Sequence, residues 1–258
     1  MALLTAIAAG IGLLNPSIYD AVVSPAIRPG VFTQDLLAAA LSLVLFGLAL
    51  SGPRYPLRKR VVAHGILGFL FYAYGIYAIE RIYTGLYPLY LAIFGLSLFA
   101  LIYSIATVPR SAADRLTVRP AVRYLGAGYG LFIAVMFTII WTGHLIPLLQ
   151  TADRIDAMYS IYIIDLSFVM PAFVIAALLA LRRHPVGLMG IPALFVLGFG
   201  ILSPLALAEI TKPVRYGLPR DMGGFWLYAI LSIVFLVSAG VYLGAMRTRP
   251  SKTGAAAD

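Results

Sequence analysis

Long runs of apolar residues, separated by short polar or proline- and glycine-containing segments, make up almost the whole chain. A bilayer core about 30 Å thick needs about 20 consecutive apolar residues in a helix, and uninterrupted runs of this length favour helices over strands. Seven runs approach or exceed that length: 36–52, 61–79, 86–108, 124–149, 157–181, 185–208 and 223–246. The pattern therefore predicts an all-α, polytopic transmembrane helix bundle.

A shorter apolar run covers residues 1–14, and the Asn-Pro, Ser-Pro and Pro-Gly pairs within 15–30 are typical of a loop. We expect the first run to form a thin or partly interfacial helix. The bundle then has eight spanning helices if this one crosses, with both termini inside, or alternatively seven if it does not, with the amino terminus outside. Thr33 is expected to cap the second helix, with Asp35 in its first turn.

The composition supports the membrane class: 62% of the residues are hydrophobic, 11% are charged, and the mean hydropathy is +0.96. Soluble domains carry about 25% charged residues. We expect one transmembrane domain over residues 1–246 and a short polar tail over 247–258. A net charge of +9 would suggest nucleic acid as a partner of a soluble protein, but in a membrane protein basic residues collect in cytoplasmic loops.

The basic residues also predict an orientation in a cell membrane. Of the 19 lysines and arginines, 13 lie in the segments 53–60, 109–123 and 182–184 and in the tail. The positive-inside rule makes this side cytoplasmic. We therefore expect the bilayer, and no nucleic acid, as the partner of the chain.

Several kinds of chemistry are excluded or disfavoured by the residue types present. The chain has no cysteine, which excludes disulfides, thiolate metal sites, iron–sulfur clusters and cysteine nucleophiles. It also lacks the H-E-x-x-H, G-x-S-x-G, P-loop and glycine-rich dinucleotide patterns. We expect neither a metal nor a cofactor.

Asp165 is the one charged residue in the run 157–181. A carboxylate at the centre of a spanning helix costs roughly 2.5–3.5 kcal/mol on insertion scales, so it needs a partner, a proton or water. Two interpretations remain open. Asp165 is either a buried structural hydrogen-bonding residue or part of a substrate, ion or proton site.

The residues expected near Asp165 come from the neighbouring run. A short link joins the runs that contain His144 and Asp165, so the two helices should be antiparallel neighbours with these residues at similar depths. We expect contact between them, directly or through Arg81, Tyr162 or water. Tyr162 shares the face of Asp165 by its spacing of three residues.

Other polar residues have simpler interpretations. Glu209 precedes Lys212 by three residues, a spacing that favours a pair on one helix face. Glu80 adjoins Arg81 at a helix end near the headgroups and is expected to pair with it. His64 adjoins a basic loop and is expected to be interfacial. The acids nevertheless gather on the outer side, where Glu80 and Glu209 join Asp165, and any polar site is expected there.

Three hypotheses for function follow. The first is a small transporter, permease or channel-like protein with an outward-facing polar cavity around Asp165, acting on a small solute, proton or cation with His144, Glu209 and Arg81 as partners. An alternative is a non-catalytic membrane subunit or assembly factor that binds other membrane subunits. A third is an intramembrane lipid-modifying enzyme that uses His144 and an acid as an acid–base pair. No motif is specific enough to choose an activity.

Overall fold

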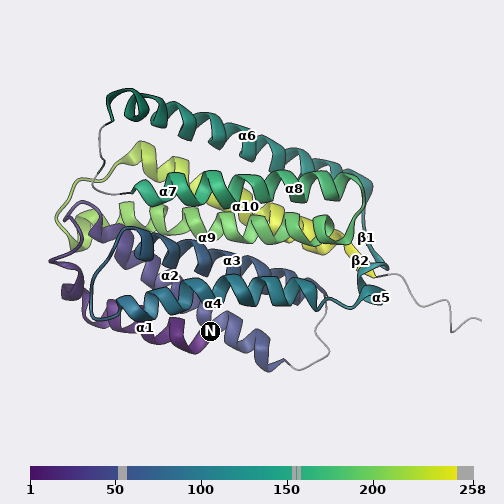
Figure 1. Cartoon of the computed structure of the whole chain (residues 1–258), viewed down its shortest axis with the longest axis horizontal. Coiled ribbons are helices and arrows are strands. Elements are labelled where there is room, and N and C mark those ends of the chain that lie inside the picture. Colours follow the sequence, from purple (N-terminus) through teal and green to yellow (C-terminus); the bar gives the residue numbers. More distant parts are fainter. Residues whose placement is uncertain (52–56, 153–154, 156–157, 249–258) are drawn as a thin grey trace, which may run out of the picture.

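The computed structural model describes residues 1–51, 57–152, 155 and 158–248. The first half contains α1 (Ala2–Leu14), a 3-10 turn η1 (Pro16–Tyr19), α2 (Arg28–Leu50), α3 (Leu57–Ile79), α4 (Tyr87–Ala106), α5 (Arg110–Ala113) and β1 (Leu116–Val118). The second half contains α6 (Pro120–Thr151), α7 (Tyr159–Ile164), a π-helical turn η2 (Asp165–Val169), α8 (Met170–Leu181), α9 (Pro185–Arg215), α10 (Met222–Ala245) and β2 (Met246–Thr248). The predicted all-α bundle is confirmed (Figure 1).

Seven helices in the described part of the chain are long and apolar enough to span a bilayer, and α7, η2 and α8 together form one of them. Helix α1 has 13 residues, which at about 1.5 Å per residue extends roughly 20 Å, less than the ~30 Å of a bilayer core. The alternative of seven spanning helices, rather than eight, therefore agrees with the structure. The chain is a polytopic membrane protein.

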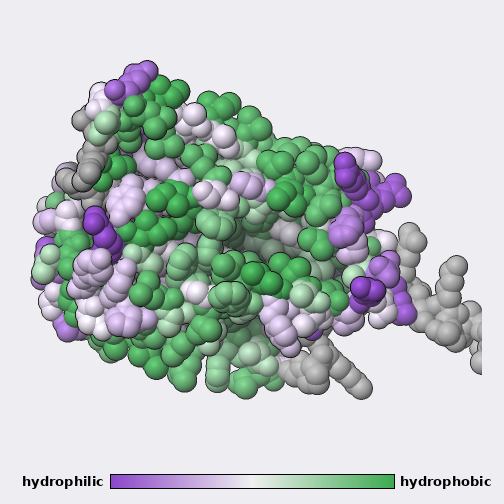
Figure 2. Space-filling view, viewed as in Figure 1, coloured by the Kyte–Doolittle hydropathy of each residue, from purple (hydrophilic) through white to green (hydrophobic). Residues whose placement is uncertain are grey.

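Helices α3 and α9 form the centre of the bundle. Helix α9 packs against α2, α3, α8 and α10, and α3 also packs against α4. Most of α3 and α9 is buried inside the protein, whereas α4, α6 and α10 leave most of their surface exposed. An apolar band covers the middle of the molecule and hydrophilic residues gather at both ends (Figure 2). The outer helices thus present apolar side chains to lipid.

The two ends of the bundle differ in charge. We call the end at which α3 finishes and α10 begins the acidic end, because it holds the carboxylates Asp20, Glu80, Glu209 and Asp221, although Arg28, Arg81, Lys212, Arg215 and Arg220 lie there too. The opposite end is called the basic end, and it carries Arg58, Lys59, Arg60, Arg110, Arg115, Arg119, Arg123, Arg182, Arg183 and Arg247. In Figure 1 the acidic end is on the left and the basic end on the right.

A short antiparallel pair of strands lies at the basic end, where the sequence predicted only loop and tail. Strand β1 pairs antiparallel with β2, with Val118 opposite Met246 and Leu116 opposite Thr248. The pairing ties the start of α6 to the end of α10. The rest of the predicted tail, 249–258, lies outside the described residues, as do 52–56 of the first basic loop and 153–154 and 156–157 of the link after α6.

The predicted start of the second helix is wrong. Helix α2 begins at Arg28, with Pro29 in its first turn, where a missing N–H is tolerated. Thr33 is consequently inside the helix and does not cap it: its hydroxyl donates to Pro29 O at 3.0 Å and to Pro204 O of α9 at 2.8 Å. Asp35 is the eighth residue of α2 and lies beyond its first turn.

A close approach of α8 and α9 depends on Gly187. A Cβ at this position would overlap the α8 backbone at Leu179 and Ala180. We expect Gly187→Ala to destabilise the protein by about 1–3 kcal/mol, because the backbone of α8 must move. Thermal unfolding of the purified protein measures this. Gly95→Ala on α4, which has nothing within 4 Å of the added methyl, is the control and should be neutral or slightly stabilising. Equal melting temperatures for the two variants would contradict the prediction.

Candidate functional site

Asp165 opens a π-helical turn in the middle of a spanning segment. The N–H of Met170 donates to the carbonyl of Asp165, five residues back. Pro171 follows directly, and a proline in a helix lacks the N–H and collides with the carbonyl four residues before it. The wider turn of η2 accommodates that collision, and such turns occur frequently at functional sites.

The Asp165 carboxylate is buried and incompletely partnered. Asp165 is 6% exposed. Oδ2 accepts a hydrogen bond from Trp141 Nε1 of α6 at 2.7 Å, and Oδ1 has no hydrogen-bond partner among the described atoms. Tyr72 of α3 is the other polar side chain that interacts with the carboxylate, as a further hydrogen-bond donor. No lysine, arginine or histidine forms an ion pair with Asp165 in the described part of the chain.

A cavity of about 200 Å³ adjoins the carboxylate. Five spanning segments line it, mostly with apolar and aromatic side chains; Tyr228 of α10 joins Tyr72, Trp141 and Asp165 as its polar members. The buried rings of Phe173 and Phe235 lie at its inner part, whereas the exposed Met158 and Leu227 lie at its part nearest the acidic end. A cavity thus adjoins Asp165, but its walls are mainly apolar, whereas the sequence predicted a polar cavity.

Helix α6 forms one wall of this cavity and is loosely held. It packs against α8 and much less against α9, α10 and η2, and Figure 1 shows it diverging from α7 toward the acidic end. Only a small share of its surface is buried. The Trp141 indole therefore connects Asp165 to a helix that has few other contacts at this end.

His144 belongs to an aromatic cluster beside the cavity. Its ring centroid lies 5.7 Å from that of Trp141 and 6.5 Å from that of Tyr162, and the Trp141 and Tyr162 centroids are 5.4 Å apart. His144 itself is exposed. The contact with Asp165 that was expected of His144 is made by Trp141 instead. Trp141 lies about one helical turn from His144 along α6, farther from the acidic end. The antiparallel pairing of the two helices predicted the neighbourhood, but not the part that Trp141 plays in it.

Glu209 lies at the acidic end and outside the cavity. Lys212 Nζ is 2.5 Å from its Oε1, so the predicted pair is confirmed. Its Oε2 accepts the backbone N–H of Asp221 at 2.9 Å, and Arg220 Nε donates to its carbonyl at 3.1 Å. These bonds fasten the connection between α9 and α10.

We expect Glu209→Ala to destabilise the protein by about 1–3 kcal/mol, because the Asp221 N–H and the Lys212 ammonium lose their acceptor. Thermal unfolding measures the effect, and Asp20→Ala, which removes an exposed ion pair with Arg28 at 2.8 Å, is the control with an expected loss below about 1 kcal/mol. A larger loss in Asp20→Ala than in Glu209→Ala would refute this assignment.

Glu80 and Arg81 end α3 without an ion pair between them in the described structure. Glu80 Oε1 accepts the N–H of Ser160 at 2.8 Å, and the Tyr159 hydroxyl donates to Ile79 O, so both bonds tie α3 to the start of α7. Arg81 is exposed and has φ 57°, the left-handed conformation that closes a helix. The predicted pairing of the two side chains is not observed.

A second buried acid, Asp35, lies in a tyrosine cluster near the acidic end. The hydroxyl of Tyr19 donates to Oδ2 at 2.7 Å and that of Tyr77 to Oδ1 at 3.0 Å. The Tyr19 and Tyr90 hydroxyls are 3.1 Å apart. Burial, reinforced by Asp35 and Tyr90, raises the pKa of Tyr19, so its hydroxyl stays a donor. Both oxygens of Asp35 are satisfied, in contrast with Asp165.

No group of three or more histidine, cysteine, aspartate or glutamate side chains within the described ranges could hold a metal ion. Comparison with known proteins gives no match to a family model, to a curated protein or to a solved structure. The interpretation of the site therefore rests on its geometry.

Proposed function

We propose that the protein is a small transporter or permease whose solute-binding site is the cavity at Asp165. The observation that supports this most is a buried carboxylate oxygen, Oδ1, without a described partner, beside a cavity of about 200 Å³. A polar atom left unsatisfied inside a membrane protein destabilises it, and such residues are commonly retained for binding.

The walls of the cavity favour one class of solute. They are apolar and aromatic, and their one charged group is negative. A small, largely apolar molecule with one protonated amine would satisfy Oδ1, neutralise the carboxylate and place its cation against aromatic faces such as Trp141 and Tyr228. By the positive-inside rule the cavity would open to the outer side of the membrane, since it lies toward the acidic end.

The path of the solute would involve α6. This helix has few contacts at the acidic end, and its Trp141 donates to Asp165. A cation that takes over Oδ2 would release the indole and let α6 move. On the other side of the site, Val169 of η2 separates this cavity from a groove in the basic half, because it lines both.

Trp141 provides a direct reporter of binding. The chain has two tryptophans, and Trp226 is exposed on α10, so Trp226→Phe leaves Trp141 as the sole indole. Titration of this protein with small apolar amines should change the Trp141 emission in a saturable way. The corresponding alcohols should bind at least tenfold more weakly, and Asp165→Asn should weaken amine binding by at least tenfold, since a buried charge pair is worth more than about 1.4 kcal/mol.

A second measurement separates transport from binding alone. Proteoliposomes should accumulate the amine that binds most tightly, and Asp165→Asn should abolish this uptake. Binding without uptake would contradict the transporter and favour a subunit that holds a ligand. No binding of any amine, with unchanged Trp141 emission in Asp165→Asn, would reject the site itself.

A further inference from the structure

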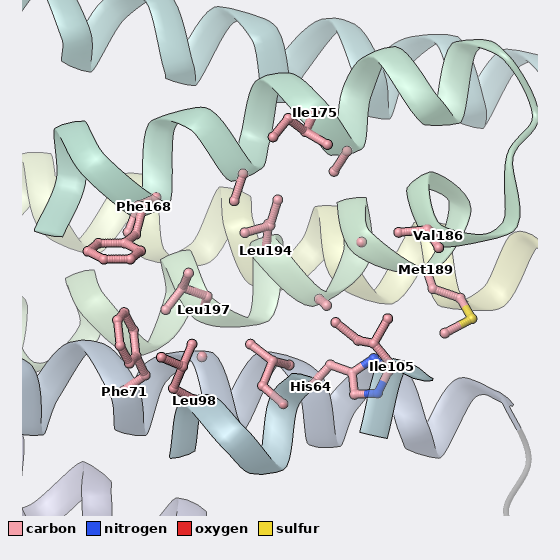
Figure 3. Close-up of a pocket in the computed structure, with 17 residues that line it drawn as sticks. His64, Phe71, Leu98, Ile105, Phe168, Ile175, Val186, Met189, Leu194 and Leu197 are labelled. Carbon is pink, nitrogen blue, oxygen red and sulfur yellow. The ribbon is translucent and has the colours of Figure 1, made fainter. Parts of the chain in front are cut away.

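A larger cavity, of about 360 Å³, lies in the basic half of the bundle. Its walls are α4 and α8, and its floor is formed by α3 and α9; the lining is apolar apart from His64 (Figure 3). Figure 2 shows a hollow at this place between the ridges of α4 and α8. Ile105 and Ile175 line it and are exposed, so it is a groove that opens sideways to lipid.

The dimensions of this groove match one leaflet of a bilayer. Along α9 it extends from Val186 to Leu197, which at ~1.5 Å per residue is about 16 Å. Half of a ~30 Å hydrocarbon core is about 15 Å. The ring of Phe168 packs edge-on to Phe71, with centroids 5.4 Å apart, and Figure 3 shows this pair at the inner end of the groove. The groove therefore runs from the basic end to the middle of the membrane and ends there.

The end of the groove near the headgroups is polar and positively charged. His64, which was predicted to be interfacial, is 4% exposed, and its Nε2 is 2.8 Å from Ser104 Oγ, so its ring packs inside the bundle at this end. Arg60 lies one turn nearer the basic end and donates to Thr107 O at 3.2 Å. Arg182 and Arg183 are exposed and lie four and three residues before the groove residue Val186 in the chain.

Negative charge is scarce at the same end. Within the described ranges, Asp114 is the one carboxylate there, and it forms no ion pair. An apolar groove of one leaflet's length, with a cationic end at headgroup level, has the shape and charge that complement an anionic lipid.

We propose that this groove binds one acyl chain of an anionic phospholipid from the leaflet at the basic end, with the headgroup phosphate bound by Arg60 and Arg182. The acyl chain of the lipid would lie along α9 and end against Phe71 and Phe168. Arginine is well suited to the phosphate because its guanidinium presents several N–H donors in one plane. The site is separate from the Asp165 cavity, and the proposal does not depend on the amine hypothesis.

Native mass spectrometry of the purified protein tests this proposal. The probes are phosphatidylglycerol and phosphatidylcholine with identical acyl chains. We expect one phosphatidylglycerol to remain bound at an affinity at least fivefold higher than phosphatidylcholine, since each basic residue near an anionic headgroup contributes roughly that factor.

Two variants fill the groove, one from the α8 wall and one from the floor. Ala172 of α8 and Gly68 of α3 both line it, and Gly68 has nothing closer than 3.8 Å to an added Cβ. Ala172→Phe and Gly68→Leu should each weaken phosphatidylglycerol binding by about tenfold or more. Ala40→Phe, the same type of change at an exposed position of α2 outside the groove, should leave it unchanged.

The headgroup is tested separately. The double variant Arg60→Gln, Arg182→Gln should remove the preference for phosphatidylglycerol while phosphatidylcholine binding stays the same. Arg81→Gln, which removes an exposed charge at the acidic end, should retain the preference. Equal binding of the two lipids by the unmodified protein, or undiminished binding in both groove-filling variants, would overturn the proposal and leave an ordinary lipid-facing depression.

Discussion

Asp165→Leu is expected to raise the thermal stability of the protein while it abolishes amine binding. The substitution removes a carboxylate that costs roughly 2.5–3.5 kcal/mol within a membrane. It also leaves Trp141 Nε1–H without its acceptor, a loss of about 1–2 kcal/mol. The net expectation is a stabilisation of about 1–2 kcal/mol, because an incompletely satisfied buried charge is often replaced by an apolar residue with a gain in stability.

This expectation distinguishes a binding residue from a structural one. If Asp165 served to hold helices together, as the subunit hypothesis requires, its replacement by leucine would lower the melting temperature and loosen α6. Thermal unfolding of Asp165→Leu and of Asp165→Asn, with the Trp141 emission followed in both, decides between these outcomes. Asp165→Asn keeps an acceptor for the indole and is the matched control for the loss of that hydrogen bond.

The second large effect is expected at Asp35, where replacement by leucine should lower the thermal stability. Asp35 is 1% exposed, and it accepts hydrogen bonds from both Tyr19 and Tyr77. Asp35→Leu would remove the carboxylate that accepts from both hydroxyls and leave them the weaker contacts with Val31 O at 3.3 Å and the Tyr90 hydroxyl at 3.1 Å. It would also place a branched side chain against Gly12 and the Tyr19 hydroxyl, which are tightly packed. We expect a destabilisation of about 3–5 kcal/mol, since each unsatisfied buried donor costs about 1–3 kcal/mol.

The measurement is again thermal unfolding, with Asp35→Asn as the conservative control. Asparagine keeps an acceptor for one tyrosine, so Asp35→Asn should lower the free energy of unfolding by about half as much as Asp35→Leu. Tyr77→Phe should lower the free energy of unfolding by less still, because Asp35 keeps its hydrogen bond from Tyr19. A leucine variant as stable as the unmodified protein would show that the tyrosine cluster contributes nothing to holding η1 and α3 around α2.

The two buried acids show which part of the site could be predicted. In the sequence, Asp165 stood out because the run 157–181 has no other charge, and this prediction led to the cavity. Asp35 was interpreted as a first-turn acid because the start of α2 was placed six residues too late. Its hydrogen-bonding partners lie 16 and 42 residues away, and no local pattern brings such residues together.

The sequence by itself determined the membrane class, the approximate spans and the position of the unusual carboxylate, because the bilayer sets the length of a spanning helix and makes a charge within it conspicuous. It also predicted the Glu209–Lys212 pair, since that contact depends only on helical spacing. The central position of α3 and α9, the bond from Trp141 rather than His144 to Asp165, and the groove between α4 and α8 became known from the folded structure alone. They could not be predicted because helix faces toward lipid and helix faces toward protein are both apolar in a membrane. Hydropathy therefore shows that a helix spans, whereas packing determines which residues meet.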